Sequence, residues 1–324
     1  MGYNLINLNE VEAGENIETV LAVKDKQGVQ SYKNGEFFTL KLGNKTGEIN
    51  AKYWGGGNGK AQKLHDKFSV GDIVKIKGKV SDYQGQPEIA LDPSGGHYIK
   101  EAVPAKYDSK DFIKSIDNNP EHLFSEISKK IRAMDNEYLK KLCMKFYGDK
   151  KIAPELKKLP AAKSYHHNKI GGYIEHIHET TELAETFCGQ YDVIDRELLL
   201  TGVFLHDIGK IHEYEYEAGI DFTDDGRLLG HIPIGDQMVM EAMNEIEGFP
   251  NDLSRKVRHL ILSHHGQKEW GSAVEPRIKE AIILHEIEYL DSKISKVIET
   301  FKKHSESEEN GVFAPELNQY IYLR

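Results

Sequence analysis

The segment Leu198–Lys210, LLLTGVFLHDIGK, is almost continuously apolar and then reaches two ionisable residues, His206 and Asp207. Such a pattern predicts a central helix that is buried on all sides. Burying an unpaired histidine and aspartate costs on the order of several kcal/mol, whereas a divalent cation binds neutral imidazole and ionised carboxylate together. Gly209 lets the helix end, and Lys210 brings a positive charge toward an anion bound there. The segment therefore predicts a metal site at the end of a core helix.

A second carboxylate lies in a long predicted helix, Pro276–His304. The core-facing stripe of this helix, at spacings of three or four, contains Leu284, Ile287, Asp291, Ile294 and Ile298. A carboxylate on such a stripe is either a metal ligand or the partner of a basic group. Twelve of the 15 histidines lie between residues 166 and 304, and this surplus favours the ligand.

Further histidines stand at predicted helix ends. His264 and His265 close the helix Leu253–His265. They cannot share one face of a regular helix, but at a fraying end both rings can reach one ion. The alternative is that cationic histidines complement the helix dipole. His231 follows a glycine near the start of the helix Leu229–Gly248, where a surface position is the alternative.

The first hundred residues are typical of short strands separated by turns. The predicted strands are Ile17–Val23, Phe37–Leu42, Gly47–Tyr53, Ile73–Val80 and Glu88–Leu91. A helical stretch, Lys60–Phe68, lies between the third and the fourth, which is the order of an OB barrel. The stretches FFTLKLGNKTGEINAKYW (37–54) and FSVGDIVKIKGKVSDYQGQPEIAL (68–91) resemble nucleic-acid-binding OB domains also found in aminoacyl-tRNA synthetases. The alternative is a small barrel that serves only for packing.

The sequence therefore predicts a multidomain chain, an all-β OB barrel followed by an all-α bundle. We expect the barrel over residues 1–100, a helical connector over 101–160, a histidine-rich helical domain over 161–308 and a tail over 309–324. Two further helices are predicted in the histidine-rich domain, Tyr173–Tyr191, which carries His176, and Glu197–His206. The tail is rich in apolar and aromatic residues, and exposing them all is unfavourable, so we expect it to dock onto a domain or onto a second subunit of a homo-oligomer.

Composition excludes several classes of protein. The sequence contains no run of 18 apolar residues, so it predicts no membrane-spanning helix. The first residues lack the basic start and the apolar stretch of a secretory signal, and we therefore expect a cytoplasmic protein. Cys143 and Cys188 form no CxxC pair, which argues against thiolate zinc sites and disulfide frameworks. The net charge is −10, yet residues 1–110 hold 15 lysines and 14 acidic residues. The acidic remainder suits cation binding, and the lysine-rich front suits a polyanion.

The order H…HD…H…HH…D, with HDIGK at 206–210, resembles the HD-domain phosphohydrolase superfamily in its two-metal form. The resemblance implies that one metal is held by His176, His206, Asp207 and Asp291. It also implies that a second metal is held by His231, His264 and His265, with Asp207 bridging the two. Nitrogen and oxygen ligands suit Mn²⁺, Fe or a comparable divalent ion.

A two-metal site of this kind activates a hydroxide between ions that lie ~3.5–4 Å apart. Lys210, His166 and His167 are then the candidates for stabilising charge on the reacting phosphate or for helping the leaving oxygen depart. For His166 and His167, the alternative is a pair that caps a helix or lies on the surface.

Three more characteristic stretches follow the OB module in the sequence: YHHNKIGGYIEH (165–176), LLGHIPIG (228–235) and LSHHGQKEWGS (262–272). Together they resemble the YhaM-type 3′–5′ exoribonucleases of Gram-positive bacteria over roughly residues 1–300. The resemblance implies that single-stranded RNA is shortened from its 3′ end to nucleoside monophosphates, with single-stranded DNA as a further substrate. Two other hypotheses stay open, a phosphodiesterase for cyclic dinucleotides or nucleotides with a regulatory OB domain, and a non-catalytic nucleic-acid-binding protein.

An OB domain grips a strand by stacking bases on aromatic rings and by binding phosphates with lysines. The stacking candidates are Phe38, Tyr53, Trp54 and Tyr83, and the phosphate candidates are Lys41, Lys52, Lys75 and Lys77. Strict alternation buries half of any strand, so some of these aromatic residues belong to the core. Trp270 is a further stacking candidate at the mouth of the metal site, with a structural plug as the alternative.

Overall fold

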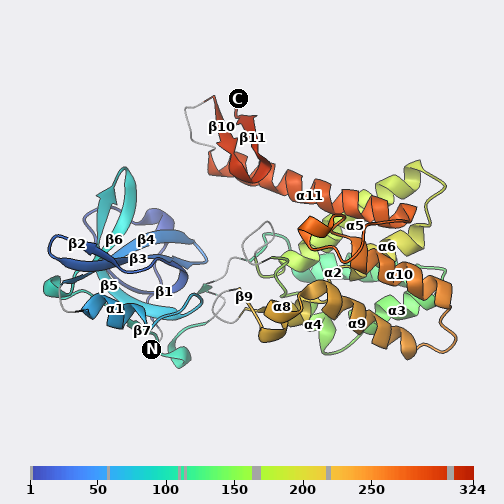
Figure 1. Ribbon diagram of the computed structural model, residues 1–324, viewed down its shortest axis with the longest axis horizontal. Helices are drawn as coiled ribbons and strands as arrows, with labels where there is room; N and C mark the ends of the chain where they lie inside the picture. The colour runs from blue at the N-terminus through green and yellow to red at the C-terminus, as the bar shows by residue number, and fades with distance from the viewer. Residues whose placement is uncertain are drawn as a thin grey trace. The chain divides into compact units, whose positions relative to one another are not determined.

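The computed structural model describes residues 3–56, 59–108, 111–112, 115–162, 169–216, 220–304 and 310–324. The chain forms two compact units (Figure 1). The first contains Met1–Ser115 and Glu215–Asp221, and the second contains Ile116–Tyr214 and Phe222–Arg324. The predicted division into an all-β front part and an all-α rear part is confirmed.

The first unit is a closed barrel. Its strands are β1 (Asn16–Lys26), β2 (Gln30–Tyr32), β3 (Gly35–Asn44), β4 (Gly47–Gly56), β5 (Ile73–Tyr83), β6 (Gln86–Leu91) and β7 (Tyr98–Glu101). Neighbours follow the order β1-β3-β4-β6-β5, and β5 closes the ring by pairing with β1. All pairs are antiparallel except β4 with β6, and α1 (Lys60–His65) follows β4. The five predicted strands are thus the five of an OB barrel, and β2 and β7 are short additions at its edges.

Alternation along the barrel strands separates core from surface. On β3, Phe38, Leu40 and Leu42 are buried. Phe37 and Thr39, which alternate with them, are partly exposed, and Lys41 is exposed. On β4, Ile49 and Ala51 continue the same core. Because successive side chains of a strand point to opposite faces, this phase decides which aromatic residues can meet a ligand.

The second unit is a helical bundle. Its helices are α2 (Pro120–Arg132), α3 (Glu137–Tyr147), α4 (Ile152–Leu156), α5 (Gly172–Gln190), α6 (Arg196–Leu205), α7 (Lys210–Glu213), α8 (Asp224–Leu228), α9 (His231–Asn244), α10 (Asn251–Ser263) and α11 (Lys279–Lys303). Helix α6 lies at the centre and packs against α3, α5, α10 and α11. Every residue from Leu198 to Leu205 is buried, as the apolar sequence predicts. A Cβ atom at Gly202 would lie 2.9 Å from Leu260 Cδ1, so this glycine lets α10 approach α6 closely.

The residues predicted as a connector divide between the units at residue 115. Helices α2 and α3 pack against α5 and α6, because their own apolar faces need a partner. The tail forms a hairpin of β10 (Gly311–Ala314) and β11 (Gln319–Tyr322), and two more short strands are β8 (Tyr214–Glu215) and β9 (Asp221–Phe222). Within the described residues, no helix is long and apolar enough to span a bilayer.

Candidate metal centre and nucleic-acid surface

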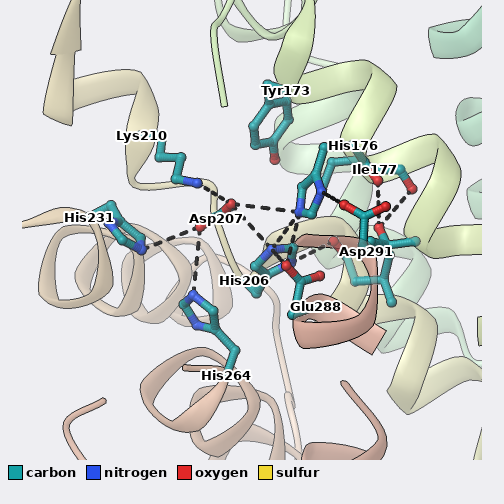
Figure 2. Close-up of polar contacts among 12 residues, drawn as sticks. Tyr173, His176, Ile177, His206, Asp207, Lys210, His231, His264, Glu288 and Asp291 are labelled. Carbon is teal, nitrogen blue, oxygen red and sulfur yellow. Dashed lines mark hydrogen bonds and ion pairs between the residues drawn. The ribbon is translucent and has the colours of Figure 1, made fainter. Parts of the chain in front are cut away.

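Four helices and one turn bring the predicted metal ligands together in the helical unit (Figure 2). They are α5 with His176, the turn after α6 with His206 and Asp207, the start of α9 with His231, the end of α10 with His264 and His265, and α11 with Asp291. Some of these residues are more than a hundred positions apart in sequence, such as His176 and Asp291, which are hydrogen bonded. All except His231 and His265 are buried.

The turn after α6 approaches the start of α9 because residue 209 is glycine. A Cβ atom at Gly209 would lie 2.0 Å from the carbonyl oxygen of His231 and 2.6 Å from the amide nitrogen of Gly235. A larger residue would therefore push α9 away from the turn. Gly209 thus allows the close approach in which Asp207 Oδ1 lies 3.4 Å from His231 Nε2.

The first group of ligand atoms belongs to His176, His206 and Glu288, and these atoms lie within 4.8 Å of one another. Glu288 Oε2 is 3.0 Å from His176 Nε2 and 3.3 Å from His206 Nε2. Asp207 Oδ2 is 3.3 Å from His206 Nε2. Two imidazoles and two carboxylates therefore face one region, and this donor set fits a divalent ion.

Asp291 contacts the other nitrogen of the His176 ring. Its Oδ2 atom lies 3.0 Å from Nδ1 of His176, the ring nitrogen that points away from the first group. Asp291 thus orients His176, and Glu288, one helical turn earlier on α11, occupies the facing position. The sequence contained a signal for Glu288, because it follows Leu284 by four residues and precedes Asp291 by three on the same stripe.

The second group of ligand atoms belongs to His231, His264 and His265, also within 4.8 Å of one another. Helix α10 ends at Ser263, so the two adjacent rings are free to converge, and their centroids are 4.4 Å apart. Asp207 Oδ1 lies 3.7 Å from His264 Nε2, while Oδ2 faces the first group. Figure 2 shows Asp207 between the two sets of histidines, the position that a bridging carboxylate requires.

In all five histidines the Nδ1 atom is already engaged by an oxygen atom outside the two groups. These contacts are His176 to Asp291 (3.0 Å), His206 to the Val203 carbonyl (3.0 Å), His231 to Glu213 (3.0 Å), His264 to the Ile261 carbonyl (2.7 Å) and His265 to the Trp270 carbonyl (2.8 Å). Since a carbonyl or carboxylate oxygen only accepts, each neutral ring carries its proton on Nδ1 and directs the Nε2 lone pair inward. Metal-binding histidines are oriented in this way.

Several buried polar atoms at this centre have no hydrogen-bond partner among the described residues. They are Asp207 Oδ1, His231 Nε2, His264 Nε2, Glu288 Oε1 and Glu213 Oε2. Buried polar atoms are nearly always paired, and leaving each of these unpaired costs roughly 1–3 kcal/mol. Their position within or beside the two groups fits bound cations.

Electrostatics differ between the two groups. Although burial disfavours a charge, the carboxylates of Glu288 and Asp291 raise the pKa of His176 to about 9. In the same way, Glu288 and Asp207 raise the pKa of His206 to about 10. In the second group, burial and the neighbouring His231 lower the pKa of His265 to about 4. Without a metal, the first group therefore carries protons at neutral pH, whereas His265 is neutral.

A cavity of about 420 Å³ opens onto both groups. Lys210 lines it and makes an ion pair with Asp207, so the predicted cation does face the centre. Trp270 also lines the cavity, and 47% of this residue is exposed. His166 and His167, predicted to bind substrate phosphate, lie outside the described residues.

In the barrel, the structure corrects two stacking candidates. Phe38 is fully buried, Tyr53 is only 8% exposed, and their rings stack on each other at a centroid distance of 5.1 Å. Both belong to the core, so the prediction that they stack on bases is wrong. Trp54 is partly exposed, and Tyr83 is 58% exposed at the β5–β6 turn, so both are placed where a ligand can reach them.

The outer face of β3 and β4 carries an aromatic cluster that the sequence only partly revealed. Trp54 contacts Phe37 and Tyr32 at centroid distances of 5.4 and 5.0 Å. Lys52 Nζ lies 4.1 Å from the Phe37 ring centroid and 4.5 Å from that of Trp54. The signal for Phe37 was its opposite phase to Phe38, since Phe37 pairs with Trp54 across the two strands. We call Tyr32, Phe37, Lys52 and Trp54 the barrel cluster.

The other candidate lysines are dispersed. Lys41 is ion-paired with Glu48 at 2.7 Å on the β3–β4 face. On β5, Lys75 is ion-paired with Glu18 of β1, and Lys77 is exposed. Strand β5 pairs with β1, β6 and β7, so these two lysines lie on a strand that is not paired with the strands of the barrel cluster.

Comparison with known proteins shows two families along the chain. The model of the HD domain matches residues 173–293, which contain both ligand groups, and the model of the OB-fold nucleic acid binding domain matches residues 20–92. The 3′-5′ exoribonuclease YhaM of Geobacillus sp. (strain WCH70) is 32% identical over 294 residues, covering 90% of this chain and 87% of its own. This chain belongs to the YhaM family.

Other YhaM enzymes agree in extent. The 3′-5′ exoribonucleases YhaM of Bacillus subtilis (strain 168) and Bacillus licheniformis are each 33% identical, over 288 and 291 residues, and each match covers 88% of this chain and 87% of the relative. YhaM-family membership therefore extends over both units and is not limited to the metal centre.

Proposed function

We propose that this chain is a metal-dependent 3′–5′ exoribonuclease that degrades single-stranded RNA to nucleoside monophosphates. The observation that carries the proposal is the pair of ligand groups joined by Asp207 in one cavity of about 420 Å³. Two adjacent cations in a cavity suit phosphodiester hydrolysis, because they can stabilise both the attacking and the leaving oxygen. Membership of a family of 3′–5′ exoribonucleases supports the polarity and the polymer.

One cation would be held by His176, His206, Glu288 and Asp207, and a second by His231, His264, His265 and Asp207. When bound, divalent ions supply Lewis acidity that neutralises phosphate charge and acidifies a hydrolytic water. The ligand set contains imidazole and carboxylate and no thiolate, so we propose Mn²⁺, with Fe or another divalent ion as substitutes.

The protein's own groups orient the ligands and the substrate. Asp291 and Glu213 hold the rings of His176 and His231 by their Nδ1 atoms, which fixes the direction of both Nε2 atoms. Lys210 faces Asp207 at the cavity and places a positive charge beside the phosphate that is cleaved. We propose that the barrel cluster binds the strand, since Trp54 and Phe37 supply rings for stacking and Lys52 a cation.

The test uses single-stranded RNA with a label on its 5′ end, incubated with the protein and Mn²⁺. We expect a ladder that shortens from the 3′ end, with nucleoside monophosphates as products, and no cleavage in excess EDTA. A circular RNA of the same sequence should resist, because it has no 3′ end. Turnover of a cyclic dinucleotide with no loss of RNA would favour a signalling phosphodiesterase, and binding of RNA without cleavage would favour a non-catalytic protein. Single-stranded DNA of the same sequence tests the breadth of substrate.

We also propose that the chain forms a homo-oligomer through its tail. Phe313, Tyr320 and Tyr322 of the β10–β11 hairpin are largely exposed, and a two-stranded hairpin is marginally stable alone. Light scattering of the full chain and of a Phe313→Ser, Tyr320→Ser double variant would test this, with a smaller particle expected for the variant. Equal masses for both proteins would exclude the tail as the interface.

A further inference from the structure

An aromatic stack borders the metal centre, and its side chains belong to neither group of ligand atoms. Trp270 ends the short 3-10 turn η5 (Lys268–Trp270) and packs against Tyr289 of α11, with ring centroids 5.5 Å apart and planes inclined by 16°. His285, one helical turn before Tyr289, lies 5.9 Å from Trp270. All three residues line the 420 Å³ cavity.

This stack leaves a large aromatic surface open. Trp270 is 47% exposed and Tyr289 is 40% exposed. An indole that served only as a plug would be expected to bury most of its surface, since burial of apolar area is what stabilises packing. One face of Trp270 packs against rings of α11, and the remainder stays accessible beside the cavity.

Two hydrogen bonds from histidine side chains to main-chain carbonyl oxygens connect the stack to the second ligand group. His265 Nδ1 donates to the carbonyl oxygen of Trp270 at 2.8 Å, and His285 Nδ1 donates to the carbonyl oxygen of His264 at 3.0 Å. Gly266 has a φ of +78° and lies so close to His285 that a Cβ atom would be 2.2 Å from the ring. The loop is therefore held in one position relative to His264 and His265.

We propose that Trp270, supported by Tyr289, is the stacking site for the nucleobase of the 3′-terminal nucleotide. A planar aromatic surface beside phosphate-binding groups matches a nucleotide, which has one flat ring and one phosphate. The cavity is at the small end of the range of roughly 300–1,000 Å³ for ligand pockets, and this size suits one nucleotide more than a longer segment. Stacking there holds the last base in place, and the scissile phosphate then lies at the metal centre.

This inference rests on the proposed function for its substrate, but it can be tested without hydrolysis. The chain has two tryptophans, Trp54 and Trp270, so the variant Trp54→Phe leaves Trp270 as the only indole fluorophore. We expect adenosine 5′-monophosphate with Mn²⁺ to quench this fluorescence in a saturable way. Ribose 5-phosphate, which has the phosphate and no base, should bind at least about tenfold more weakly. Equal responses to the two ligands, or no response to either, would overturn the proposal.

The second arm measures kcat/KM on two RNAs that differ only in whether the 3′-terminal ribose carries its base. We expect the wild type to prefer the complete RNA by about tenfold, and Trp270→Ala to reduce this ratio to about one, with Trp270→Phe between them. Tyr191→Ala removes another exposed ring of the helical unit and should keep the wild-type ratio. An unchanged ratio in Trp270→Ala would refute the stacking site.

The fluorescence titration and the kcat/KM comparison together distinguish failure of the stacking site from failure of the exoribonuclease proposal. Hydrolysis of RNA without base dependence leaves the exoribonuclease proposal intact and removes the stacking site. Base-dependent quenching by adenosine 5′-monophosphate in a protein that hydrolyses no RNA supports the stacking site and removes the exoribonuclease. Metal content of Trp270→Ala should equal that of the wild type, because the carbonyl oxygen that accepts from His265 belongs to the main chain.

Discussion

The helical unit and the barrel differ in how deeply their candidate binding residues are buried. At the metal centre, His206, Asp207 and His264 are almost inaccessible, and Asp207 Oδ1 and His264 Nε2 have no hydrogen-bond partner among the described residues. In the barrel, Lys52 and Trp54 remain at the surface and already contact each other. A bound cation would supply the missing partners at the centre, whereas the residues of the barrel surface already contact each other.

The largest expected effect comes from removing the bridging carboxylate. Asp207→Ala takes one oxygen from each ligand group, and we expect RNA hydrolysis to fall on the order of 10³-fold, which corresponds to several kcal/mol of charge stabilisation. Initial rates with labelled RNA measure the loss. Asp252→Ala, at an exposed ion pair on α10, is the matched control and should keep wild-type activity. Retained hydrolysis in Asp207→Ala would separate catalysis from this centre.

A second comparison lies within α11. Glu288→Gln removes a carboxylate that faces both histidines of the first group, and we expect activity to fall on the order of 10²–10³-fold. Asp291→Asn removes only the charge behind His176, and we expect a loss of about 10–100-fold in metal affinity. Measurements of the metal content and the kcat of both variants show which substitution is the more damaging. If Asp291→Asn proves the more damaging, Asp291 is a direct ligand, as the sequence first suggested.

The two ligand groups also differ in their protons. His176 and His206 have raised pKa values, about 9 and about 10, so they are protonated at neutral pH, and a cation must displace about two protons. Affinity at this group should therefore rise with pH below 9, by up to about 100-fold per unit. The pKa values of His264 and His265 are lowered, so these two rings add no such dependence near neutrality. Calorimetric titration with Mn²⁺ in buffers of different ionisation enthalpy counts the protons, and equal release in both binding steps would contradict the assignment.

The smallest effect is expected in the barrel. Trp54→Ala should weaken binding of single-stranded RNA by about tenfold, because one stacking surface is lost while the fold keeps its core. Phe38→Ala should instead lower the free energy of unfolding by about 3–5 kcal/mol, since its ring is fully buried. Fluorescence anisotropy and thermal unfolding measure the two effects. Loss of RNA affinity in a stably folded Phe38→Ala, with none in Trp54→Ala, would reverse the assignment of faces.

The candidate site was more predictable in the helical unit than in the barrel. An ionisable residue at an apolar position is unusual, so His206, Asp207 and Asp291 were conspicuous in the sequence. In the barrel, aromatic residues occur both in the core and on the surface, and a shift of one position along a strand moves a side chain from one face to the other. The neighbours Phe37 and Phe38 illustrate this, because the sequence favoured Phe38, whereas in the structure Phe38 is buried and Phe37 is partly exposed.

The sequence by itself determined the two kinds of architecture and the types of residue at the metal centre. Periodicity identifies strands and helices locally, and the cost of burying charge points to a cation before any coordinates are known. Only the tertiary structure decided which carboxylate of α11 faces the Nε2 atoms of His176 and His206, and that Trp270 lies on Tyr289 beside the cavity. Those choices depend on the rotation of one helix and the path of one loop, which packing between distant segments fixes and local sequence does not.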